Sequence, residues 1–116
     1  MKESDVILTP MPQADGNVKH RPAIILRAMP SFGDMLVCGV SSQLRHFVQG
    51  FDEIITPEDA DFTSSGLVAA SLIRLGFLAV LPRRIIAGSI GSIAPERHKR
   101  LLKALSIYLV RDLDVP

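Results

Sequence analysis

The sequence lacks several residue types whose presence would point directly to a class of site. Its 116 residues include no tryptophan, one tyrosine and a single cysteine. One cysteine excludes an internal disulfide, and because Cys38 lies in the apolar run 35–38 we expect a small buried hydrophobic side chain. One cysteine and three scattered histidines match no zinc-binding spacing. The sequence therefore predicts neither a metal site nor a cofactor.

Long apolar runs and a large net charge are also missing. No run approaches the roughly 18 apolar residues of a membrane helix, and the acidic segment 1–5 is unlike a signal peptide, so we expect a cytoplasmic protein with no membrane partner. The net charge is only +1. However, five of the twelve acids lie within 52–61, which leaves seven acids against thirteen Lys and Arg elsewhere. The remaining surface is either locally basic or simply solvated.

What is present is typical of one globular domain spanning residues 1–116. Apolar residues make up 47% and charged residues 22% of the chain, as in ordinary globular proteins. Short apolar segments between Gly- and Pro-rich turns predict a loop at 9–17, a helical turn within 58–66, and strands at 5–8, 22–27, 35–40, 51–55, 70–75 and 85–93. This pattern indicates a mainly β fold with α, a small SH3-like β-barrel closed by a C-terminal helix.

Residues 95–110 are expected to form that helix. Pro95 suits the first helical position and Glu96 favours the positive helix end, whereas Ala94 is a poor N-cap that costs about 1 kcal/mol relative to Ser. Helical spacing predicts an apolar stripe of His98, Leu101, Leu102, Leu105, Tyr108 and Leu109. The basic residues should lie away from the stripe: Arg97, Lys99, Arg100 and Lys103.

A compact basic group, Lys19-His20-Arg21, stands directly before Pro22 and the apolar run 23–26. Proline restricts the preceding residue to an extended backbone, which predicts that Arg21 marks the mouth of a strand. A guanidinium held there suits a phosphate. The alternative is a solvated turn without a ligand.

Four landmarks in order resemble the MazF/PemK toxins of bacterial type II toxin–antitoxin systems. The first strand and its loop resemble the PemK-like branch, and the Arg21-Pro22 pair resembles the family's x-Arg-Pro signature. A strand that ends in a hydroxyl residue and the C-terminal half complete the match. The landmarks are segments 5–16, 19–23, 38–43, and 71–75 with 88–96 and the helix.

The resemblance implies a dimeric barrel of the MazF/Kid/CcdB kind. These toxins are similar to metal-independent, sequence-selective endoribonucleases, or mRNA interferases, that cleave single-stranded RNA. The 2′-hydroxyl attacks the adjacent phosphate and leaves a cyclic phosphate. A cognate acidic antitoxin lays a disordered tail into the RNA groove.

Two residues are predicted to carry catalysis. Negative charge builds on the phosphate oxygens during attack, and one preorganised donor aimed there is worth about 3 kcal/mol. Arg21 fits that role, and Ser41 occupies the position where the family usually has Thr. The alternative for Ser41 is a strand-end hydroxyl bonded to its own backbone.

Further residues are predicted to contact RNA. His20 is an acid/base or RNA-contact candidate, although neighbours in an extended chain point to opposite sides. We expect Arg21 and Arg74 to line one groove across a dimer, with Arg45 or His46 beside them. The predicted RNA-binding residues are Lys19, Gln43 and Arg74.

The chain departs from the family pattern in ways that leave alternatives open. The Arg-x-Asp of the Kid-type branch reads Arg74-Leu75-Gly76, and Asp15, the nearest acid to the usual first-loop Glu, is expected in a turn. Either a reduced set cleaves RNA, or the barrel binds RNA without cleavage. A third class is a barrel that binds a protein target. The gyrase poison CcdB does so with a Trp-Gly-Ile end, whereas segment 114–116 here is Asp-Val-Pro.

Overall fold

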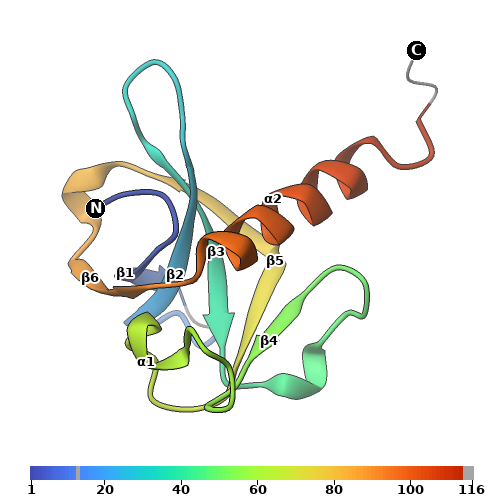
Figure 1. Ribbon diagram of the computed structural model, residues 1–116. Coiled ribbons are helices and arrows are strands. Elements are labelled where there is room, and N and C mark those ends of the chain that lie inside the picture. Colours follow the sequence, from blue (N-terminus) through green and yellow to red (C-terminus); the bar gives the residue numbers. More distant parts are fainter. Residues whose placement is uncertain (13, 114–116) are drawn as a thin grey trace.

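A computed structural model of the chain describes residues 1–12 and 14–113 (Figure 1). Six antiparallel strands form one curled, half-barrel sheet in the order β4-β5-β3-β2-β1-β6, followed by the C-terminal helix α2 (Pro95–Val110). The strands are β1 (Asp5–Pro12), β2 (Val18–Ala28), β3 (Met35–Ser41), β4 (Glu53–Ile55), β5 (Ser71–Leu81) and β6 (Gly88–Ser92). The predicted fold class is therefore confirmed.

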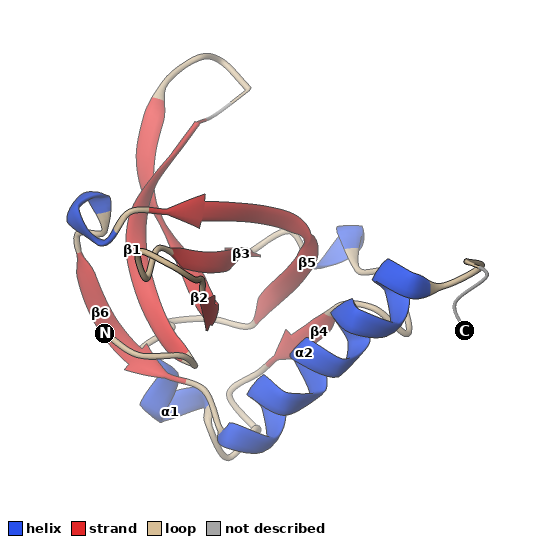
Figure 2. Cartoon of the chain, turned by 90° about the horizontal axis from the view of Figure 1, so that it is seen from above, coloured by secondary structure: helices blue, strands red, loops and turns tan. Residues whose placement is uncertain are grey.

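The hairpin of β1 and β2 is longer than the sequence predicts, and Figure 2 shows it extending beyond the rest of the sheet. Pairing runs from Val6↔Ile24 to Pro12↔Val18, so residues 9–12 of the expected loop 9–17 belong to β1, and Gln13 lies outside the described residues. Beyond Leu8, where the pairing with β6 ends, β1 has only β2 as a partner. A proline can therefore lie in this part of β1 wherever the position of its absent N–H points away from β2, because no hydrogen bond of the ladder is then lost.

The central strands bury side chains on both faces, which explains the unbroken apolar run 23–26. On one face, Ile24 and Leu26 join a cluster that packs against Leu101 and Leu105 of α2. On the other face, Ala23 and Ile25 join a second cluster, whose other members are Ile7, Met35, Val37 and Ile86. The second face leads to the site described below.

Helix α2 has the predicted bounds, but its apolar stripe is buried only as far as Leu105. Leu101 is fully buried, whereas Tyr108 is 51% exposed and Leu109 is 61% exposed. The predicted stripe therefore continues as exposed apolar surface beyond Leu105, where the end of the helix extends past the sheet (Figure 1).

The sequence predicts that Arg97 lies away from the apolar stripe, with the other basic residues of the helix. It is instead buried, with only 6% of its surface exposed. Its Nε donates to Asp61 Oδ2 over 2.8 Å, and its Nη1 donates to Glu53 Oε1 over 2.8 Å. The hydrogen bond from Arg97 holds the pKa of the Asp61 carboxyl below its usual 3.8. Asp61 Oδ2 also accepts the Ala94 N–H over 3.0 Å, which ties the residue before the helix to segment 52–61. Acids of segment 52–61 therefore anchor α2.

The remaining differences concern element ends. β4 begins at Glu53 and β6 at Gly88, both later than predicted, and residues 83–85 form a 3-10 turn before β6. The expected helical turn is α1 (Phe62–Ser65). β5 continues to Leu81, past its predicted end at residue 75, through an irregularity in its pairing with β3. A Cβ at Gly91 would collide with the backbone of Ser64, so β6 does approach a neighbouring segment closely.

Cys38 is fully buried, and burial raises the pKa of its thiol to about 12. The expectation of a small buried side chain at position 38 is confirmed. None of the helices in the described ranges is long and apolar enough to cross a membrane. The C-terminal segment 114–116, which differs from the end of the gyrase poison, lies outside the described residues.

Candidate functional site

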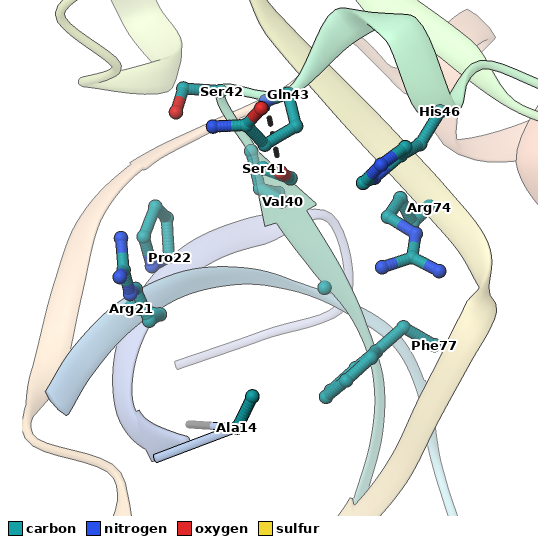
Figure 3. Close-up of a pocket in the computed structure, with 11 residues that line it drawn as sticks. Ala14, Arg21, Pro22, Val40, Ser41, Ser42, Gln43, His46, Arg74 and Phe77 are labelled. Carbon is teal, nitrogen blue, oxygen red and sulfur yellow. Dashed lines mark hydrogen bonds between the residues drawn. The ribbon is translucent and has the colours of Figure 1, made fainter. Parts of the chain in front are cut away.

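A cleft of about 500 Å³ opens beside the end of β3, between β2 and β5 (Figure 3). Figure 3 shows Arg21 on one wall, Arg74 and His46 on the opposite wall, and Ser41 between them. No carboxylate of the described residues is among those that line the cleft, so its charged lining there is basic. The lining residues are Ala14, Arg21, Pro22, Gly39, Val40, Ser41, Ser42, Gln43, His46, Arg74 and Phe77.

Strand alternation explains why Arg21 and Ser41 meet. Side chains two residues apart share a face of a sheet, so Arg21 lies on the same face of β2 as Ala23, and Ser41 lies on the same face of β3 as Gly39. Ala23 pairs with Gly39, and the described pairing of these two strands ends there. The face of β2 and β3 that contributes apolar side chains to the second cluster therefore carries polar side chains, Arg21 and Ser41, beyond the last pair of these strands.

Arg21 is exposed and lies inside β2, opposite Thr9 of β1. The expectation that it marks the beginning of its strand is wrong, because β2 already begins at Val18. Pro22 instead lies just beyond the last pair of β2 with β3, which is Ala23 with Gly39. A proline there, which has no N–H, removes no hydrogen bond from that pairing. Pro22 and the buried Ala23 fix the backbone from which the Arg21 side chain extends.

Ser41 is half-buried, and its Oγ accepts the Gln43 N–H over 3.0 Å. This is the backbone contact that the alternative interpretation expects. A hydroxyl that accepts one hydrogen bond still carries a hydrogen to donate. Ser41 can therefore hold the 41–43 turn and donate into the cleft, and Gln43 is placed beside it.

The opposite wall depends on Asp52, a residue that no pattern in the sequence singles out. Asp52 is 8% exposed; its Oδ2 accepts the Val48 N–H and its Oδ1 accepts the Leu75 N–H, each over 3.0 Å. These bonds tie the segment that carries His46 to the part of β5 that carries Arg74. The positions of those two cleft side chains are consequently coupled.

Lys19 and His20 do not line the cleft. His20 is on the face of β2 opposite to Arg21 by strand alternation, as the sequence suggested. Lys19 lies farther out on the hairpin, where it pairs with Met11. Asp15 accepts the Asn17 N–H over 3.0 Å as a turn residue. Arg45, the alternative to His46 as a groove residue, is likewise not part of the lining, whereas His46 is.

Arg21, Arg74 and the Ser41 hydroxyl, on separate walls of one cleft, can contact successive phosphates of one chain. Guanidinium groups bind phosphate through paired charge-assisted hydrogen bonds, and the Ser41 hydroxyl is a further donor. No group of three or more His, Cys, Asp or Glu side chains in residues 1–12 and 14–113 is arranged to hold a metal ion. The arrangement suits an anionic, extended ligand.

Comparison with known proteins identifies the family of this chain and supports its fold. A family model described as PemK-like, MazF-like toxin of type II toxin-antitoxin system matches residues 2–109. The structure is similar to that of Mycobacterium tuberculosis toxin MazF-mt6, with a TM-score of 0.65, 18% sequence identity, and coverage of 96% of this chain and 99% of that chain. At that identity the likeness shows the fold alone. A comparison with curated protein sequences gave no significant match.

Proposed function

Because the chain belongs to the PemK-like, MazF-like toxins of type II toxin–antitoxin systems, we propose that it is a metal-independent endoribonuclease that cleaves single-stranded mRNA in the cytoplasm. One observation carries the proposal. The two residues predicted to be catalytic, Arg21 and Ser41, line the same cleft, whose charged lining among the described residues is basic.

The proposed reaction is a transesterification within the RNA chain. The ribose 2′-oxygen attacks the adjacent phosphorus, the bond from phosphorus to the 5′-oxygen breaks, and the products are a 2′,3′-cyclic phosphate and a 5′-hydroxyl. The attacking hydroxyl loses one proton and the leaving oxygen gains one. No atoms are added, so the step needs no co-reactant.

Arg21 neutralises the charge that builds on the nonbridging phosphate oxygens, and Ser41 donates a hydrogen bond to one of them. Arg21 is a permanent cation and cannot carry the proton. Among the described lining residues, His46 has the side-chain type that exchanges a proton near neutral pH. Gln43 and Arg74 hold the flanking RNA, while Lys19 and His20 are proposed as outer contacts along the hairpin.

An RNA cleavage assay in excess EDTA tests the proposal. We expect wild-type protein to cut single-stranded RNA, and Arg21→Ala to lower the rate by about 10²- to 10³-fold, the usual cost of one lost transition-state donor. Arg27→Ala is the matched control, because Arg27 is an exposed arginine at the far end of the same strand. Intact RNA with the wild type, or equal rates for the two variants, would refute cleavage at this site.

The lack of a carboxylate in the described lining favours a second candidate, RNA binding without cleavage. The same samples distinguish the two functions when RNA binding is followed by fluorescence anisotropy. Binding that depends on Arg21, together with intact RNA, would support the second candidate over the first.

Membership of the family implies an antitoxin as partner. We propose that an acidic antitoxin segment competes with RNA for the basic cleft, and that the toxin is a homodimer. The exposed apolar end of α2 supplies surface for subunit contact; its residues are Ile107, Tyr108, Leu109 and Val110. Light scattering after size exclusion checks the dimer, and Leu109→Arg should lower the measured mass if this end is buried between subunits.

A further inference from the structure

Phe77 is an aromatic side chain in a cleft whose charged lining is basic, and phosphate binding does not account for it. It is 37% exposed and lines the cleft beside Arg74. The chain has only five phenylalanines and no tryptophan. A partly exposed ring at this position can pack against a ligand that has a flat apolar surface of its own.

An irregularity in β5 delivers this ring to the cleft. Opposite β3, Gly39 pairs with Arg74 while Cys38 pairs with Leu78, so residues 75–77 fall between two consecutive pairs. In a regular strand Leu75 and Phe77 would share a face. Here Leu75 is fully buried in the cluster under α2, whereas Phe77 lines the cleft. The extra residues 75–77 change which side chains of β5 point towards the cleft, so that Phe77 lies on the cleft face although Leu75 does not.

The Phe77 ring packs against Gly39. A Cβ at position 39 would lie 3.1 Å from Cδ1 and 3.4 Å from Cγ of Phe77, closer than side chains normally pack. The ring therefore rests against the β3 backbone at a position where a larger residue would displace it. Figure 3 shows it projecting from β5 into the cleft.

A cation lies beside the same ring. The Arg74 Cζ is 5.8 Å from the Phe77 ring centroid, within the range of a cation–π interaction. Proteins that bind single-stranded nucleic acid combine basic groups for the backbone with aromatic rings on which bases stack. Arg74 and Phe77 supply the two parts of that combination on one wall.

We propose that Phe77 is a stacking platform for one unpaired base of the RNA, seated on Gly39 and adjacent to Arg74. The inference deepens the proposed ribonuclease function and depends on RNA entering this cleft. It assigns to β5 a base-binding role separate from the phosphate-binding role of Arg21.

Tryptophan fluorescence offers a direct test, because the wild-type chain has none. Phe77→Trp places the sole tryptophan in the cleft, and Phe32→Trp is the matched control, since Phe32 is 91% exposed in the turn before β3 and is not part of the lining. The ligand is a single-stranded oligonucleotide with 2′-O-methyl riboses, which cannot react. We expect it to quench Phe77→Trp and leave Phe32→Trp unchanged, while inorganic polyphosphate quenches neither.

Affinity measurements with the same oligonucleotide separate stacking from apolar packing. Phe77→Ala should weaken binding about 5- to 150-fold, the range for one lost base–aromatic stack. Phe77→Leu keeps an apolar side chain against Gly39 and should also weaken binding, whereas Phe77→Tyr keeps an aromatic ring and should bind with the wild-type affinity. Circular dichroism of each variant identifies any loss of folding.

The outcomes distinguish this inference from the proposed function. If the wild type cleaves unmodified RNA but bound oligonucleotide does not quench Phe77→Trp, the stacking role is refuted and the ribonuclease remains. Wild-type affinity in Phe77→Leu refutes the stacking role as well. Quenching without cleavage supports the platform and refutes the nuclease, and no binding of RNA at all overturns both.

Discussion

Replacing Arg97 by Met should destabilise the protein far more than the same replacement of an exposed arginine. Arg97 is 6% exposed and donates three short hydrogen bonds, two to Asp61 at 2.8 and 3.1 Å and one to Glu53 at 2.8 Å. Methionine has a similar length but no donor. Glu53 keeps Arg100, whose Nε donates to it over 3.0 Å, so the orphaned group is Asp61.

The expected magnitude follows from the burial of that carboxylate. Asp61 is 8% exposed and would retain the Ala94 N–H as its remaining side-chain contact among those described. Removing one partner of a buried ion pair typically costs about 3–5 kcal/mol, a large part of the roughly 5–15 kcal/mol that stabilises a domain. Because Asp61 also holds the start of α2, we expect the helix to loosen from the sheet.

Urea unfolding followed by far-ultraviolet circular dichroism measures the effect at one fixed protein concentration. Arg27→Met is the control, since the Arg27 side chain is 58% exposed and its nitrogen lies 3.7 Å from Glu3; exposed pairs contribute about 0–1 kcal/mol. The double variant Arg97→Met/Asp61→Asn should recover part of the loss, because no buried charge is left. The reasoning is refuted if Arg97→Met costs no more than the control.

Three further predictions concern pH, burial and salt. The Arg97 hydrogen bond lowers the pKa of Asp61 below 3.8, so its stabilisation is complete above that pH and is lost as the pH falls below it; the stability difference between wild type and Asp61→Asn, measured by thermal melts, should shrink below about pH 4. Thr9 is fully buried, and its Oγ1 has no partner among the described residues, so Thr9→Val should raise the free energy of unfolding by about 1 kcal/mol in urea titrations, and a decrease would contradict this. If Arg21 and Arg74 each neutralise one phosphate, RNA affinity measured by anisotropy should fall about sevenfold between 50 and 200 mM salt, and Arg74→Ala should halve the logarithmic slope; an affinity that ignores salt would count against the cleft.

Local signals predicted much of the fold. The apolar run 23–26 identified a strand buried on both faces, and Pro95 with Glu96 identified the first turn of α2. Arg21 and Ser41 were selected from the sequence, and both line the cleft. The inferences on the strand, the helix and Arg21 rest on side-chain alternation and on the chemistry of single residues, which a sequence displays directly, whereas Ser41 was identified from the resemblance to the MazF/PemK toxins.

Other features depend on segments that are far apart in the chain. Arg97 looked like a surface residue because its helical position is polar, and its burial required Asp61, 36 residues away. The coupling of the cleft walls through Asp52 depends on a bond to Leu75, 23 residues away. Helical and strand periodicity contain no information about such pairs.

The sequence by itself determined which segments are apolar, where the long helix begins, and which cation stands next to the buried core. Only the tertiary structure decided that the basic group lies in a long hairpin, that β5 turns Phe77 towards Arg74, and that acidic residues of 52–61 anchor a buried arginine. The physical reason is that propensity and alternation act between neighbouring residues, whereas strand register, irregular pairing and the burial of a charge are settled by contacts that form only when the whole sheet is assembled.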